Sequence, residues 1–148
     1  MNSKIHAIAG VIGFLTILTF WTSTVCSELF GSIATIVTVK GMILNGMFVL
    51  IPAMAVAGAS GMNIGRRRKD APALAKKRRM PFIAANGLLI LVPAAFYLQA
   101  KASAGIFDST FYTVQVLELL AGAVNLILMG LNIRDGRAMT KLKRQRAG

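Results

Sequence analysis

The chain has 148 residues, of which 55% are hydrophobic and 15% charged, with a mean hydropathy of +0.65 and a formal net charge of +12. This composition excludes an ordinary soluble domain, and it also excludes a disordered chain, which is rich in charge and poor in apolar residues. The single cysteine, Cys26, excludes an internal disulfide scaffold and a cysteine-based zinc finger. We therefore predict an integral membrane protein whose basic residues set its topology, with no nucleic-acid partner.

Four segments are long and apolar enough to cross the hydrocarbon core, which takes about 20 residues of helix. They cover residues 5–26, 41–65, 80–100 and 109–133. The uncharged stretch 29–39 is too short to cross, and we interpret it as an outer-surface or re-entrant segment, or as an extension of the second helix. The first segment lacks a signal-peptidase site and is expected to remain uncleaved. The predicted fold is an all-α, integral membrane four-helix bundle.

The distribution of lysine and arginine predicts the orientation of this bundle. Eight of these residues lie in the connection 66–79 and six in the tail 134–148, and Lys4 adds one at the N-terminus. Only Lys40 and Lys101 fall on the other side. Because cytoplasmic loops carry the excess of positive charge, both termini are predicted to be cytoplasmic, in the inner membrane of a bacterium-like cell. The two basic segments are also expected to contact anionic lipids.

Two spans carry small and polar residues at alternating spacings of three and four, which places each set on one helix face. In the first span these are His6, Ala9, Gly13, Thr16, Phe20 and Ser23. In the last span they are Gln115, Glu118, Gly122, Asn125, Met129 and Asn132. Small and polar residues mark the faces where helices meet in lipid, so both faces are expected to point into the bundle.

Glu118 is the one formal charge inside a predicted span. An ionised carboxylate there costs about 2.5–3.5 kcal/mol, so we expect it to be protonated, paired or in contact with water. With no basic residue inside a predicted span, the neutral form is expected, close to Thr16 and to Gln115 and Asn125 of its own helix. Lys40 or Lys101 would be a partner only by folding inward. The carboxyl is interpreted either as a proton or cation site or as an interhelical hydrogen bond.

The second and third spans share the pattern Asn-Gly, five apolar residues and Pro-Ala, at 45–53 and 86–94. Proline removes a backbone donor, so we expect bends near Pro52 and Pro93. Asn45 and Asn86 are expected to bond to neighbouring helices. The pattern is compatible with the inverted elements of transporters and with simple helix packing. It is also compatible with a chance match, because membrane-spanning segments use few residue types.

His6 is the only histidine, near the cytoplasmic end of the first span. Its imidazole is compatible with a place among head groups, with proton relay, or with ligation of haem b. A haem would then have Met129 or Met62 as its second ligand, a five-coordinate iron, or a ligand from a second subunit.

Three functions are therefore compatible with the sequence, and catalysis is the least favoured because no nucleotide-binding, metalloprotease or hydrolase motif occurs. The first is a non-catalytic bundle acting as a homo-oligomer or as a subunit of a membrane complex, favoured by the small residues between 53 and 61. The second is a proton-linked small-solute transporter that uses Glu118. The third is a redox or haem protein that uses His6.

Overall fold

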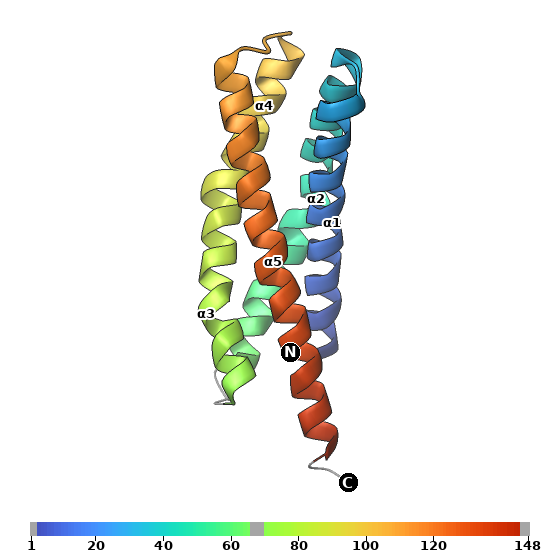
Figure 1. Ribbon diagram of the computed structural model, residues 1–148. Helices are drawn as coiled ribbons and strands as arrows, with labels where there is room; N and C mark the ends of the chain where they lie inside the picture. The colour runs from blue at the N-terminus through green and yellow to red at the C-terminus, as the bar shows by residue number, and fades with distance from the viewer. Residues whose placement is uncertain (1–2, 66–69, 146–148) are drawn as a thin grey trace.

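The computed structural model describes residues 3–65 and 70–145. All regular structure within these ranges is helical, which confirms the predicted all-α class. The elements are α1 (Ser3–Phe30), α2 (Ile33–Gly65), α3 (Ala71–Asn86), the π-helical turn η1 (Gly87–Leu91), α4 (Val92–Ser103) and α5 (Ser109–Gln145). Because α3, η1 and α4 follow one another without a break, the chain forms four long rods side by side (Figure 1).

All four rods are long and apolar enough to cross a membrane. Large apolar side chains cover the outside of the bundle, and Phe30, Phe48 and Leu89 are exposed by 85%, 82% and 74%. A bundle folded in water would bury such side chains, whereas lipid tails solvate them without cost. These surfaces are those of a multi-pass membrane protein.

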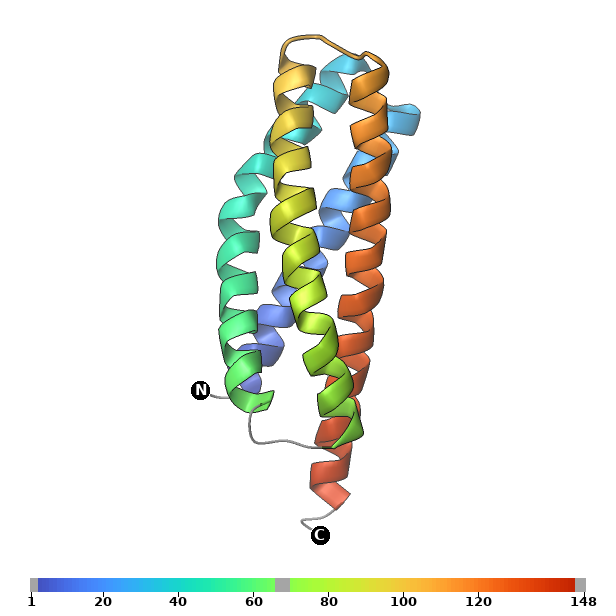
Figure 2. The same cartoon turned by 90° about the vertical axis from the view of Figure 1, so that its left-hand side faces the viewer.

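The rods are arranged as a ring of four. α1 packs against α2 and α5, and the rod α3–η1–α4 packs against the same two helices. Within the described residues the diagonal pairs, α1 with α3–η1–α4 and α2 with α5, do not meet backbone to backbone. Both termini lie at one end, which we call the N/C end, and the opposite end is called the far end (Figure 2). Side chains that reach across the axis therefore determine how each end is closed.

The helices are longer than the predicted spans. α3 begins at Ala71, after Asp70 at the N-cap and with Pro72 in its first turn, so most of the predicted loop 66–79 is helical. α5 continues through the predicted tail to Gln145. Hydropathy detects only the apolar part of a helix, whereas the basic end turns continue the same backbone hydrogen bonds outside the hydrocarbon core.

Of the interpretations given for 29–39, the structure contradicts a separate outer or re-entrant segment and confirms an extension of the second helix, which begins at Ile33. α1 continues to Phe30, and only Gly31 and Ser32 separate it from α2. A Cβ at position 31 would lie 2.5 Å from a carbonyl oxygen in the last turn of α1, so the tight turn requires glycine. The hydroxyl of Ser32 accepts the Thr35 N–H at 3.2 Å and caps α2. Lys40 consequently lies about two turns inside α2.

The two prolines affect their helices differently. Pro52 lies within α2, which stays helical from end to end and curves in Figure 2. Pro93 is the second residue after the π turn η1, at whose end the N–H of Val92 donates to the carbonyl of Gly87. The wider turn accommodates the region where proline removes a helical hydrogen bond.

Candidate functional site

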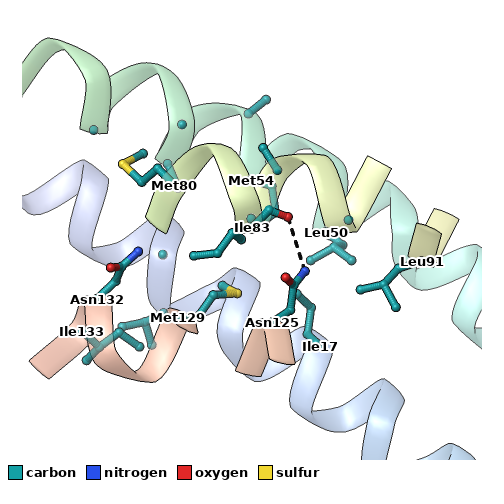
Figure 3. Close-up of a pocket in the computed structure, with 18 of the residues that line it drawn as sticks. Ile17, Leu50, Met54, Met80, Ile83, Leu91, Asn125, Met129, Asn132 and Ile133 are labelled. Carbon is teal, nitrogen blue, oxygen red and sulfur yellow. Dashed lines mark hydrogen bonds between the residues drawn. The ribbon is translucent and has the colours of Figure 1, made fainter. Parts of the chain in front are cut away.

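A cavity of about 650 Å³ lies along the bundle between the four rods. Its volume is in the range of small-molecule binding sites, about 300–1,000 Å³. The wall is largely apolar and includes Met47, Met54, Met80 and Met129. Figure 3 shows side chains from several helices around this space, with Asn125 among them. The cavity exists because the diagonal helices do not pack against each other.

Lys40 is the central group of a polar cluster in the far half of the bundle. Its side chain is 1% exposed and reaches from α2 across the axis to α5. There its ammonium donates to the Gln115 amide oxygen and, at 3.2 Å, to Glu118 Oε2. Oε1 of Glu28, on α1, lies 3.9 Å from the same nitrogen. We call Glu28, Lys40, Gln115 and Glu118 the Lys40 cluster.

The expectation of a neutral Glu118 without a basic neighbour is therefore wrong, because Lys40 lies inside α2 and supplies the countercharge. The expected contact with Thr16 is also wrong. The Thr16 hydroxyl donates to a carbonyl of its own helix at 2.8 Å. Beside Glu118, α1 contacts α5 through Trp21, whose Nε1 donates to the carbonyl of Leu119 at 2.9 Å.

The Lys40 cluster holds one more carboxylate than ammonium. The Gln115 amide donates to Glu118 Oε2 at 2.9 Å, so this carboxylate has two donors. Glu28 Oε1, in contrast, is buried without a hydrogen-bond partner in the described part of the chain. One added proton would balance the charges of the cluster, which is a property expected of a proton site.

Lys101, the other candidate partner of Glu118, pairs with Asp108 instead. Its ammonium donates to Asp108 Oδ2 at 2.5 Å, between the end of α4 and the start of α5. The same carboxylate accepts the N–H of Phe111 at 2.9 Å. The Lys101 hydrogen bond, followed by that from the backbone, holds the pKa of Asp108 below its usual value. Lys101 and Asp108 therefore join the two helices at the far end.

His6 is the centre of a second cluster, at the N/C end. Its Nδ1 lies 3.0 Å from both the Ala57 carbonyl oxygen and Ser60 Oγ of α2. Its Nε2 lies 2.7 Å from the ammonium of Lys76 on α3. Because an ammonium can only donate, Nε2 accepts and Nδ1 carries the proton, so the ring is neutral. Lys76 thereby connects α3 to α1 across the other diagonal.

A further ion pair joins α3 to α5 beside this cluster. Arg79 donates to Asp135 Oδ2 at 2.6 Å, and Arg134 donates to the other oxygen of Asp135 at 3.3 Å. The Asn132 amide oxygen lies 3.5 Å from Arg79. Arg79, Arg134 and Asp135 belong to segments that served in the sequence only as signals of topology, whereas Asn132 was expected on the inward face of the last span.

The predicted haem ligands do not fit a haem. Both ring nitrogens of His6 are already engaged by α2 and α3. Met129 packs toward Gly13, seven residues or about 10 Å further along α1 than His6. Axial ligands must approach one iron from opposite sides. We therefore derive no function through haem.

The two asparagines of the shared pattern differ in their surroundings. Asn86 donates to the Ala121 carbonyl at 2.8 Å and to Asn125 Oδ1 at 2.9 Å, which ties α3 to α5. Asn125 in turn donates to the Ile83 carbonyl at 3.4 Å (Figure 3). Asn45 is exposed on α2. The two copies of the pattern thus do not form equivalent contacts.

No protein-family model matches the chain, and no characterised protein or solved structure matches it. The chemistry of the cavity and of its two polar clusters is the basis for functional inference. Sequence reasoning missed Glu28 as a member of the site, and it named Lys40 only as a partner that would have to fold inward. An available signal was that Lys40 is the only charged residue between positions 29 and 65.

Proposed function

We propose that this protein is a proton-linked carrier of a small solute, which binds in the bundle cavity. The observation that carries the proposal is the buried Lys40, which joins α2 to α5 across the axis at the far side of the cavity. Ionisable groups inside membrane spans are a functional hypothesis by default, because they are costly to keep there.

Protonation supplies a way to open the far end. The Lys40 ammonium is held by the Glu118 carboxylate, and the backbones of α2 and α5 do not otherwise meet. Glu118 lines the cavity and Glu28 does not, so a proton that arrives through the cavity reaches Glu118 first. This proton removes the charge that attracts Lys40, while Glu28 remains 3.9 Å from the ammonium and pairs with it. The diagonal tie is then weaker, and α2 and α5 can separate to admit the solute.

The N/C end has a tie of its own across the other diagonal, from Lys76 to His6. A carrier needs two closures that are not open together, one on each side of its binding site. The Lys40 cluster and the His6–Lys76 tie lie on opposite sides of the middle of the cavity, which suits them to these two roles.

Accessibility of introduced cysteines tests the proposal. Met47 and Gly58 both line the cavity, nearer to the far end and to the N/C end respectively. In a Cys26→Ala background, Met47→Cys and Gly58→Cys are treated with a membrane-impermeant thiol reagent, from either face of the membrane. Rates from the far side are normalised to Ser103→Cys, at the end of α4, and rates from the other side to Lys141→Cys, which is exposed on the last turns of α5. This removes the effect of pH on thiol chemistry.

A carrier predicts that acid raises the normalised rate of Met47→Cys from the far side and lowers that of Gly58→Cys from the other side. Glu118→Gln, which imitates the protonated acid, should give the acid pattern at every pH. Rates that change neither with pH nor with Glu118→Gln would refute the carrier.

A second reading is the non-catalytic bundle that forms a homo-oligomer or part of a membrane complex. Small side chains of α2, among them Ala55 and Ala59, are exposed and allow close approach of another helix. Two results would favour this reading over the carrier: cysteine accessibility that does not change with pH, and a stable oligomeric mass by light scattering in detergent.

A further inference from the structure

We infer that the solute is a long-chain fatty-acid anion, bound with its carboxylate at the N/C end and its chain along the cavity. The inference rests on the proposed carrier function and names its substrate class. Three properties of the cavity support it: its length, its apolar middle and the separation of charges between its ends.

The cavity is long and narrow. On α5 its lining residues run from Glu118 to Thr140, which corresponds to about 33 Å of helix. The whole hydrocarbon core, filled by two layers of acyl chains, is about 30 Å thick. A volume of about 650 Å³ over this length suits an unbranched chain better than a compact solute.

The middle of the cavity offers little to a polar solute. Ile17, Leu50 and Met54 contribute apolar surface, and flexible methionine side chains adapt to the shape of an alkyl chain. Figure 3 labels two polar side chains of the lining, Asn125 and Asn132. The amide of Asn125 is already engaged by Asn86 and by the Ile83 carbonyl, and Asn132 lies further toward the N/C end, with its oxygen 3.5 Å from Arg79. A sugar or an amino acid would leave its own polar groups without partners here.

The charges at the two ends orient an amphiphile. Lys76, Lys77 and Arg137 line the N/C end, and the Lys76 ammonium uses only one of its donors on His6. Asp135, the nearby carboxylate, is paired with arginines. Towards the far end the lining includes the Glu118 carboxylate. A carboxylate head group is thus attracted to the N/C end and repelled from the far end.

The single tryptophan provides a direct test. Trp21 lines the cavity 15 residues, or about 22 Å of helix, from His6 at the N/C end. The full chain in lipid nanodiscs is titrated with stearate brominated near its methyl end or near its carboxyl end, since bromine quenches tryptophan at short range. A brominated phospholipid gives the background from the bilayer. We expect saturable quenching of Trp21 above this background, stronger for the methyl-end bromines.

Matched variants identify the site. Gly58 lines the cavity, and a Cβ there would meet open space, so Gly58→Leu should fold and obstruct the chain. Gly130 also has open space but does not line the cavity, and Gly130→Leu is the control. The double variant Lys77→Gln/Arg137→Gln should weaken binding of the acid about tenfold or more and leave its methyl ester unchanged.

The inference is overturned if stearate quenches no more than the phospholipid, or if Gly58→Leu binds as Gly130→Leu does. It is also overturned if a long-chain amine competes with the acid as well as another acid does. These results concern the ligand alone, since binding is measured without transport. A change of cysteine accessibility with pH would then still support a carrier, for another solute.

Discussion

Lys40 is the residue on which the far half of the bundle depends most. Among the described residues, its ammonium is the cation that pairs with both Glu28 and Glu118. Removing one partner of a buried pair leaves an uncompensated charge, which costs about 3–5 kcal/mol. An interhelical hydrogen bond in a membrane contributes about 0.6–1.7 kcal/mol. Removing Lys40 is therefore expected to cost more stability than neutralising Glu118.

We predict that Lys40→Met lowers the free energy of unfolding by about 3–5 kcal/mol. Glu118→Gln should lower it by only about 1–2 kcal/mol, because the amide still accepts from Lys40. The double variant should cost clearly less than the sum, since Lys40→Met no longer leaves Glu118 charged. Denaturant titration of helix content in mild detergent measures all three.

Lys101→Met is the matched control, because its pair with Asp108 is at the exposed end of the bundle. Exposed pairs contribute little to stability, because water and salt screen them. A cost for Lys40→Met no larger than for Lys101→Met, or strict additivity with Glu118→Gln, would contradict the buried cluster.

At this scale the sequence indicates one half of the site. A carboxyl within an apolar helix is visible directly, and helical spacing places Gln115 and Asn125 on the same face, where both are buried. The sequence cannot choose between its two candidate partners, Lys40 and Lys101, because burial of Lys40 depends on where α2 begins. The role of His6 depends on Lys76, which is 70 residues away in the chain and had been assigned to a loop.

At the scale of helices, hydropathy predicts the four rods but not their ends. Residues 71–79 and 134–145 are helical although strongly basic, since helix formation needs backbone hydrogen bonds and not apolar side chains. The start of α2 depends on the turn at Gly31 and Ser32. This turn places Lys40 in the interior and not at the membrane surface.

We predict that Gly31→Ala destabilises the protein by more than about 1 kcal/mol, because its methyl group would collide with the backbone of α1. Gly10→Ala, with open space around its Cβ inside α1, should instead stabilise it by up to about 1 kcal/mol. Thermal or denaturant unfolding of both variants in the same detergent tests the sign of each change. Equal effects would show that the turn tolerates a side chain.

At the scale of the whole molecule, the positive charges lie mainly at the N/C end and predict a cytoplasmic location for it. A reporter that works only in the cytoplasm should therefore be active when it is fused after Gly148 or inserted at Pro72. A reporter that works only outside the cytoplasm should be active when it is inserted at Ser103, at the far end. An external signal from the C-terminal fusion, or a cytoplasmic one from Ser103, would reverse the orientation.

The short connection between α1 and α2 also bears on how the chain enters the membrane. Synthesis proceeds from the N-terminus, so Lys40 is made 78 residues before Glu118. During that interval α5 does not exist, and the lysine would stand alone in a growing hairpin. Glu28 lies on the other arm of that hairpin, close to Lys40 across the turn. The α1–α2 hairpin thus contains a counterion for Lys40 as soon as it is made. Glu118 becomes the nearer partner of Lys40 once α5 has been synthesised and packs against the hairpin.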